Sequence, residues 1–263
     1  MTPSVREFGR VNWLGFWTLY SREVRRFMKV HFQTIGAPAV MALLFLAVFS
    51  LALGRAVRTE HGVPFTTFLA PGLMMMAIIQ NSFANTSSSI MIAKVQGNIV
   101  DMLMPPISPG EMMLAMTLGG ATRGLVVGAA VMVAMSLFVD VRIHNPFAIL
   151  YFALSASLML SFIGMLAGIW ADKFDHMAAV TNFVVTPLSF LSGTFYSIER
   201  LEGGFRLLAY VNPFFYNIDG FRGGFIGSHD ANALTGVLVT LGVNLVLGTL
   251  TYAVIRRGYK LKT

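Results

Sequence analysis

The sequence contains no cysteine, so it can form neither a disulfide framework nor a thiolate metal site. Charge is scarce as well: charged residues make up 12% of the 263 residues, whereas hydrophobic residues make up 56%. A chain with so few charges has too little polar material to surround a soluble core with a water-facing surface. A cleaved signal peptide is not expected, because the first apolar run, residues 35–53, is longer than the roughly 7–15 residues of a signal-peptide core.

Six long apolar runs fill the chain instead, and each approaches or exceeds the ~20 residues that a helix needs to cross about 30 Å of hydrocarbon. We predict membrane spans at residues 33–53, 65–92, 112–139, 146–170, 177–197 and 233–255. The predicted fold class is all-α integral membrane, with six transmembrane helices. Residues 1–32 form a tail with an amphipathic interfacial helix, and residues 33–263 form one transmembrane domain.

Positive charge is unevenly distributed between the two sides of the predicted membrane domain. Twelve Lys and Arg residues fall on the side of the two termini, and six fall on the other side. By the positive-inside rule, both termini are expected to be cytoplasmic. The net charge of +7 is explained by this placement beside the membrane, so we expect no nucleic acid partner.

The stretch before the first span reads as an amphipathic interfacial helix. At about 100° per residue, its large aromatic side chains share one direction and its basic side chains lie opposite. The aromatic residues are Trp13, Phe16, Trp17 and Tyr20, and the basic residues are Arg22, Arg25 and Arg26. Two interpretations remain open: an anchor that prefers anionic lipid, or a docking surface for a cytoplasmic partner.

Polar side chains recur along one face of the second span and of the fifth. They are Asn81 and Asn85 in the second span, and Asn182, Thr186 and Ser189 in the fifth. Such groups do not face lipid readily. Either they form hydrogen bonds between helices, at about 0.6 kcal/mol each, or they line a path for a substrate.

The third and fourth spans carry stripes of glycine that predict close helix packing. These residues are Gly120, Gly124 and Gly128 in the third span, and Gly164 and Gly168 in the fourth. The third span also holds Arg123, the one charge inside any predicted span. Its guanidinium could extend to the inner headgroups, pair with another helix or contact an anionic substrate.

The loop between the second and third spans is the most patterned cytoplasmic segment. Ile99, Met102 and Leu103 predict an apolar ridge projecting from a short helix that two prolines end. Ser108 and Glu111 then form a capping box at the start of the third span. The last loop, residues 198–232, is rich in aromatics and divided by Pro213, which predicts a helical hairpin dipping into the outer interface.

Sequence motifs for catalysis are absent. The chain has no phosphate-binding G-x-x-x-x-G-K-[ST] loop, no G-x-S-x-G turn and no H-E-x-x-H helix. Asp172, Asp175 and His176 are better explained as a solvated turn than as a metal site. We therefore expect no catalytic residue, no metal and no ATP hydrolysis by this chain.

The order of these parts resembles the membrane permease of ATP-binding cassette exporters of the ABC-2 type. The resemblance rests on the entry helix FWTLYSREVRRFMKV, the loop KVQGNIVDMLMPPISPGEM and the segment FYSIERLEGGFRLLAYVNPFFYNIDGFRGGFIG. It implies a bacterial inner-membrane dimer of permeases with two copies of a separate ATPase, which would bind ATP and Mg²⁺. The substrate would be amphiphilic, such as a lipid-linked, glycan-like or drug-like molecule.

The same resemblance assigns roles to residues of this chain. The short loop helix would insert into the ATPase, the interfacial helix would lie beside it, and the polar faces of the second and fifth spans would line the path between two copies. The coupling residues would be Gly97, Asn98, Ile99, Asp101, Met102, Leu103 and Glu111.

Two other classes of membrane protein need sequence features that differ from those of this chain. An ion-gradient-driven secondary transporter usually needs intramembrane acids and an inverted repeat, and the sequence shows neither. A membrane-embedded enzyme needs a nucleophile, acid or metal cluster at one depth, and the charged residues here fall in loops.

Overall fold

The structure, a computed structural model, describes residues 11–53 and 59–260, without the side chains of Leu53, Met102 and Leu103. Residues 1–10 of the predicted tail therefore lie outside the described part. The elements of the first half are α1 (Trp13–Met28), η1 (Phe32–Gly36), α2 (Ala37–Leu53), β1 (Thr59–Glu60), β2 (Val63–Pro64), α3 (Phe65–Val95), α4 (Ile99–Leu103) and α5 (Pro109–Ser136). Those of the second half are α6 (Pro146–Trp170), α7 (Phe174–Val180), η2 (Thr181–Val185), α8 (Thr186–Leu191), η3 (Ile198–Arg200), α9 (Gly204–Val211), α10 (Pro213–Ile226) and α11 (Ala233–Arg257).

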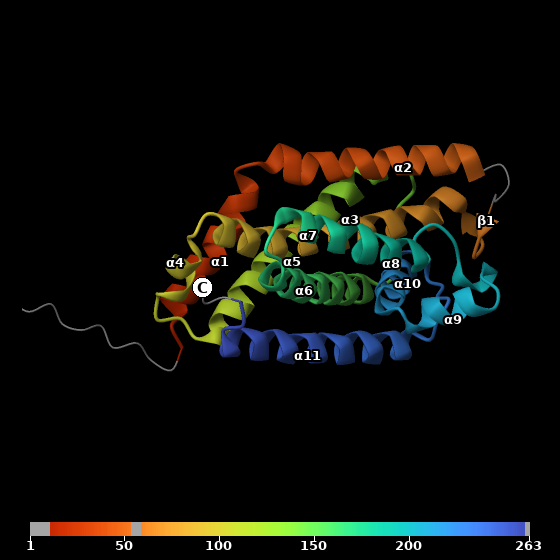
Figure 1. The fold of residues 1–263 in the computed structure, drawn as a ribbon. Coiled ribbons are helices and arrows are strands. Elements are labelled where there is room, and N and C mark those ends of the chain that lie inside the picture. Colours follow the sequence, from red (N-terminus) through yellow and green to blue (C-terminus); the bar gives the residue numbers. More distant parts are fainter. Residues whose placement is uncertain (1–10, 54–58, 261–263) are drawn as a thin grey trace, which may run out of the picture.

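The long helices lie side by side, with α2 and α11 on opposite edges and α3, α5 and α6 between them (Figure 1). α3 is the innermost helix, and it packs against α5, α6 and α10. One end of the molecule carries α1, α4 and the last turn of α11, and the other carries the β1–β2 hairpin and α9 (Figure 1). These ends are called the α1 end and the α9 end below.

The predicted all-α membrane architecture is confirmed. Within residues 11–53 and 59–260, five helices are long and apolar enough to span a membrane. The remaining predicted span, the fifth along the chain, is the helical run α7–η2–α8, which continues from Phe174 to Leu191 but changes from α to π and back. The interfacial helix α1 and the hairpin of α9 and α10, divided at Pro213, are also present.

The fifth span ends earlier than predicted. We expected it to reach residue 197, but α8 ends at Leu191. Gly193 then adopts a φ of 74°, a left-handed conformation that stops the helix. Pro187 has no N–H to donate, and this proline is the second residue of α8, which begins where the π-helical segment η2 ends.

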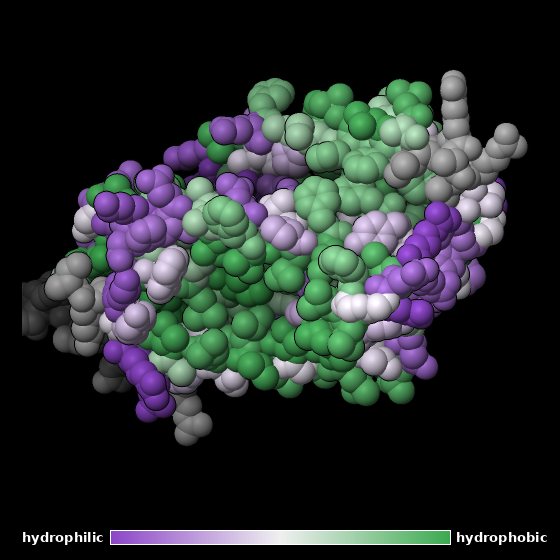
Figure 2. All heavy atoms as spheres, turned by 45° about the vertical axis from the view of Figure 1, so that its right-hand side comes forward, coloured by the Kyte–Doolittle hydropathy of each residue, from purple (hydrophilic) through white to green (hydrophobic). Residues whose placement is uncertain are grey.

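The surface has the polarity expected of a membrane protein. On the face seen in Figure 2, hydrophilic residues gather at the two ends and hydrophobic residues fill the band between them. The helices at the edges expose large apolar side chains, among them Leu44 and Leu51 of α2 and Leu245 of α11. This band matches the hydrocarbon layer that the sequence predicts.

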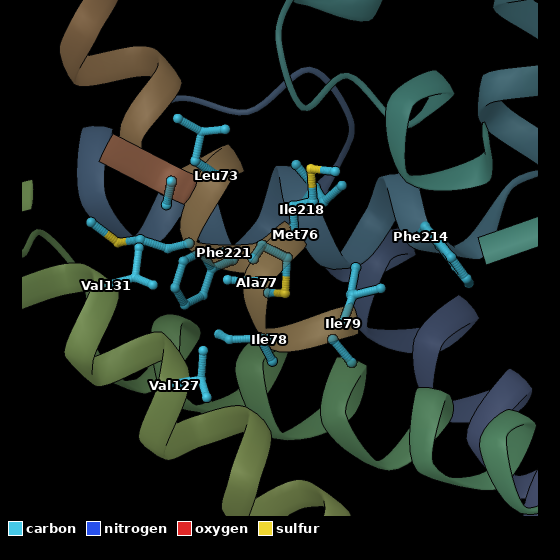
Figure 3. Close-up of a cluster of buried hydrophobic side chains, with 14 of the residues drawn as sticks. Leu73, Met76, Ala77, Ile78, Ile79, Val127, Val131, Phe214, Ile218 and Phe221 are labelled. Carbon is cyan, nitrogen blue, oxygen red and sulfur yellow. The ribbon is translucent and has the colours of Figure 1, made fainter. Parts of the chain in front are cut away.

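The apolar core lies in the half of the molecule nearer the α9 end. Leu73, Met76 and Ile78 of α3 meet Val127 and Val131 of α5 there, and α10 adds further side chains to the cluster. Figure 3 shows Ile218 and Phe221 of α10 directed toward these residues. The hairpin is therefore part of the packed core and not a loop lying on the surface.

Glycine permits close contact where the polar half of α3 meets α5 and α6. A Cβ atom at Gly164 of α6 would lie 2.6 Å from the carbonyl oxygen of Phe83. One at Gly120 of α5 would meet Ser161 and Thr86. Because these positions have no side chain, backbones approach closely enough for Thr86 Oγ1 to donate to the Ser161 carbonyl at 2.9 Å.

Replacing Gly164 by alanine should therefore destabilise the protein. The added methyl group would overlap a backbone carbonyl that cannot move independently, at a cost of about 1–3 kcal/mol. The measurement is thermal or denaturant unfolding of the purified protein in detergent. Gly242→Ala in α11 is the control, because a Cβ there meets nothing within 4 Å. Equal stability of the two variants would contradict this account of the contact.

Candidate coupling and translocation site

One carboxylate joins the starts of α1 and α5. Glu111 accepts hydrogen bonds from the backbone N of Ser108 and of Asn12, both at 2.7 Å. The Ser108 hydroxyl accepts from Glu111 N at 3.3 Å, which completes the predicted capping box. Asn12 in turn caps α1 by accepting from Gly15 N at 2.9 Å. The N-termini of the two helices are thereby held together.

One residue of the apolar ridge predicted on the short helix α4 is buried. Ile99 is buried against Leu19, Met112 and Ile255, so the prediction that its side chain projects outward was wrong. A helix of five residues has no stable face of its own, and its neighbours decide which way it turns. The side chains of Met102 and Leu103 lie outside the described residues.

Two apolar side chains of this loop are nevertheless exposed. Val100 is 48% exposed and Met104 is 77% exposed. Gly97 has a φ of 72°, which lets the chain reverse between α3 and α4, and Asn98 and Asp101 are exposed beside it. A cleft of about 760 Å³ separates this loop from the basic side of α1. Its charged lining consists of Arg22, Arg25, Arg26, Lys29 and Asp101.

The loop between α6 and α7 is bound by a lysine at the end of α3 and by a lysine that follows α11. Lys94 Nζ at the end of α3 donates to the carbonyl of Ile169 at 2.9 Å, which satisfies the C-terminus of α6. Asp172 accepts from Lys260 Nζ at 2.8 Å, and this hydrogen bond lowers the pKa of Asp172 and raises the pKa of Lys260 from their ordinary values. The α1 end is therefore fastened at several points.

A buried ionic cluster connects α1 to α3. The Glu23 carboxylate has no exposed surface, and it binds Arg22 at 2.9 Å, Arg26 at 3.1 Å and Ser89 Oγ at 2.7 Å. Arg26, on the basic side of α1, turns inward. Its Nη2 donates to the carbonyl oxygen of Asn85 at 2.6 Å and to Asn85 Oδ1 at 3.1 Å.

The protein-facing side of α1 lies between its exposed tryptophans and its exposed arginines. Leu19, Glu23 and Phe27 are its buried residues. Trp13 and Trp17 are exposed, while Phe16 and Tyr20 are half-buried against the cluster that includes Leu19. An interfacial helix with exposed tryptophans and adjacent arginines has the side chains that the headgroup region favours.

Arg123 of α5 binds the next polar position of α3. Its Nη2 donates to Asn81 Oδ1 at 2.9 Å, and Asn81 Nδ2 donates to the Ala77 carbonyl at 3.0 Å. Of the three partners considered for Arg123, the structure places a neighbouring helix beside it. The two predicted amides of α3 thus each receive an arginine, one from α1 and one from α5.

A groove of about 530 Å³ opens between η1, α2, α3 and α8. Its walls are mostly apolar and include Met41, Phe45 and Phe190, and amides cluster on Gln33, Gln80 and Asn81. Thr186 borders it from α8. Asn81 and Thr186, predicted from opposite spans, therefore meet the same cavity.

The other predicted path residues do not reach this groove. Asn85 and Ser189 are fully buried within the single chain, and Ser189 Oγ donates to the Val185 carbonyl at 2.7 Å. Asn182 is exposed on η2. In this conformation the polar stripes serve mainly hydrogen bonding between and within helices, and only part of each stripe is available to a ligand.

Asp230 joins three segments at the α9 end. Its carboxylate, 1% exposed, accepts from Ser197 Oγ at 2.8 Å and from Ile198 N at 3.0 Å. His61 Nε2, in the turn between β1 and β2, lies 2.7 Å from Asp230 Oδ1. The β hairpin, the start of η3 and the chain after α10 are thus fixed to one another.

Two charged residues of α10, Arg222 and Asp219, anchor this helix through separate contacts. Arg222 is buried and donates to the carbonyl oxygen of Gly193 at 2.6 Å, while its guanidinium lies 3.9 Å from the ring centre of Phe68. Asp219, one turn earlier, accepts from the backbone N of Asp230 at 2.8 Å and of Ala231 at 3.1 Å. The hairpin therefore binds both the end of α8 and the start of α3.

Sequence reasoning missed Glu23, Arg222 and Asp230. The signal for Glu23 was an acid placed among the three arginines of one helix, where its i,i+3 partner is Arg26. The signal for Arg222 was a charge inside an aromatic segment with Asp219 three residues before it. Asp230, in a loop, gave no comparable signal.

Comparisons with known proteins agree with this arrangement. A family model described as ABC-2 type transporter matches residues 15–226. The chain is 34% identical over 253 residues to "Inner membrane transport permease YadH" of Escherichia coli (strain K12), an alignment that covers 95% of this chain and 98% of that protein. It is 25% identical over 254 residues to "Nodulation protein J" of Rhizobium leguminosarum bv. viciae, covering 95% of each chain.

The contacts of Asp230 predict that Asp230→Asn destabilises the α9 end. The amide keeps the shape but loses the charge, and hydrogen bonds to a buried charge are worth about 1.5–3 kcal/mol each. We expect a lower melting temperature and faster proteolysis of the β1–β2 hairpin. Asp140→Asn is the control, because its ion pair with Arg142 is exposed and worth at most ~1 kcal/mol. A similar loss in both variants would rule out a special role for Asp230.

Proposed function

Because the chain belongs to the ABC-2 type transporter family, we propose that it is the permease subunit of an exporter driven by a separate ATPase. It is the non-catalytic membrane subunit of such a transporter. ATP and Mg²⁺ would bind to the partner ATPase. Two copies of the permease and two of the ATPase would form the complex, in a bacterial inner membrane with the α1 end in the cytoplasm.

The observation that carries this proposal is the construction of the α1 end. Glu111 joins α1 to α5, and the Glu23 cluster joins α1 to α3, so α1 and the neighbouring α4 loop are firmly fixed to the membrane helices. Val100 and Met104 are exposed on this α4 loop, and basic and polar groups of the neighbouring cleft lie beside them. Exposed apolar residues with a polar rim are typical of a protein interface.

The groove beside α3 supports an amphiphilic substrate. Its apolar walls suit a hydrocarbon portion, and the amides of Gln33, Gln80 and Asn81 suit a hydroxyl- or amide-bearing portion. The outward faces of α2 and η2 next to it carry exposed apolar side chains, including Met41, Leu44 and Phe183. A second permease placed against these faces would enclose the groove and complete a path.

Docking of the ATPase should depend on the exposed loop residues. The double change Val100→Asp and Met104→Asp places charges in an apolar contact, and a desolvation penalty of several kcal/mol weakens binding about 100-fold or more. Native mass spectrometry of the detergent-solubilised complex should show two permeases and two ATPases for the wild type, and permease without ATPase for the variant. Because both side chains are exposed, the melting temperature of the permease alone should be unchanged.

Lys173→Glu is the matched control, since it alters a charge at the same end of the molecule but on the loop between α6 and α7. It should keep the ATPase bound. Normal assembly and export in the Val100→Asp and Met104→Asp variant would show that the α4 loop is only a connector.

Accessibility of the groove can be tested with single cysteines, because the natural chain has none. Gln80→Cys and Thr186→Cys should react with a small water-soluble thiol reagent, at rates that change when nucleotide or substrate is added. Ser189→Cys, buried, and Leu245→Cys, on the exposed apolar face of α11 at the opposite edge of the molecule (Figure 1), should remain unreactive. Uniform reactivity at all four positions, or none at any, would exclude this groove as the path.

A further inference from the structure

Glu23 occupies an unusual position for a carboxylate. It lies on α1, a helix at the surface of the molecule, yet its side chain has no exposed surface. Three donors surround it: Arg22 at 2.9 Å, Arg26 at 3.1 Å and Ser89 of α3 at 2.7 Å. A buried carboxylate is stable only with such partners, so the position of each donor is tightly constrained.

The pocket that holds Glu23 is formed by three helices. Gly119 of α5 faces it, and a Cβ atom there would lie 2.6 Å from the Glu23 Cβ. Ser89 closes the pocket from α3. α1, α3 and α5 therefore meet at this one side chain.

Arg26 extends the cluster along α3. It binds Asn85 through the backbone carbonyl at 2.6 Å and through Oδ1 at 3.1 Å, and it donates to Ser88 Oγ at 3.1 Å. These contacts and that of Ser89 span more than one turn of α3. Polar contacts distributed over a full turn fix both the rotation of α3 about its axis and its position along that axis relative to α1. An apolar contact would define these two quantities less sharply.

The same stretch of α3 leads into the groove. Asn81 lies four residues before Asn85 on the same helical face, and it lines the groove while binding Arg123 of α5. Hydrogen bonds therefore link Arg26 of the Glu23 cluster to Asn85, and one further turn of α3 leads from Asn85 to Asn81.

We propose that Glu23 is a positioning residue that makes α1 and the adjoining half of α3 move as one body. Displacement of α1 by the ATPase would then reach the groove through α3. This inference rests on the proposed function, because it assumes that the ATPase acts on the α1 end. Its structural part can be tested on the permease alone.

The first measurement uses no ATPase. Spin labels at Leu14→Cys in α1 and Val95→Cys in α3, both exposed in the native chain, report the distance between the helices in nanodiscs by double electron–electron resonance. The native background should give one narrow distribution, and Glu23→Gln should broaden it or add a second distance. Arg25→Gln is the control, because it removes a charge from an exposed position of the same helix. A narrow distribution in Glu23→Gln overturns the proposal.

The second measurement uses the complex with its ATPase in proteoliposomes. Glu23→Gln should keep the ATPase bound and keep basal hydrolysis, while export per ATP hydrolysed falls by about tenfold. Arg257→Gln, which removes an exposed charge from the last turn of α11 at the same end of the molecule, should keep the native ratio. An unchanged ratio in Glu23→Gln, or equal losses of binding, hydrolysis and export, would overturn the positioning role.

Two further variants keep the test decisive. If Glu23→Gln does not fold, Ser89→Ala removes one donor without creating a new charge and should show the same broadening to a smaller extent. Arg26→Gln combined with Glu23→Gln should lower the stability of the permease by less than the sum of the single changes, because both act on one contact.

Failure of the wild-type permease to bind any ATPase would refute the proposed function, and the spin-label distances would still decide whether Glu23 fixes α1 to α3.

Discussion

The need to satisfy polar groups buried away from water is the constraint on which the rest of this structure depends. α3 is the most enclosed helix, yet the half nearer the α1 end is rich in amides and hydroxyls. Inside protein or hydrocarbon, such groups are costly unless they are hydrogen-bonded. Arg26 from α1 and Arg123 from α5 supply partners to Asn85 and Asn81. The positions of α1 and α5 against α3 are thus set by these bonds as well as by packing.

The other half of α3 is held in a different way. Toward the α9 end, its residues are apolar and pack with α5 and α10 (Figure 3). This contact depends on the complementary shapes of the side chains and not on directional hydrogen bonds. At the junction of the two halves, Gly164 of α6 and Gly120 of α5 allow a close approach, and Thr86 bonds to α6. One helix therefore combines a segment held by apolar packing with a segment in which directional polar contacts are added to the packing.

Much of the fold could be predicted from the sequence because hydrocarbon imposes a length and a composition on each span. The capping box at Ser108 and the division of the hairpin at Pro213 were also readable, since each depends on local chemistry. The site was harder to predict. Periodicity placed Asn85 on a polar face of its helix. It does not predict which residue of another helix binds there, and that residue is Arg26 of α1. Ile99 turned inward because tertiary contacts orient a helix of five residues.

The two ends of the molecule use single buried charges to bind several segments at once. Asp230 holds three segments at the α9 end, and Glu23 sits where three helices meet at the α1 end. Between the ends, the groove is bordered by η1, where the hydrogen-bond register departs from that of an α-helix, and by α8, which follows the π-helical segment η2. The two routes from α1 to the groove therefore differ. α1 connects to α3 through buried charged contacts, whereas it connects to α2 along the chain through the π-helical turn η1. The position of α1 against α3 is therefore specified by side-chain chemistry, whereas its position relative to α2, its neighbour in sequence, is specified by the chain connection.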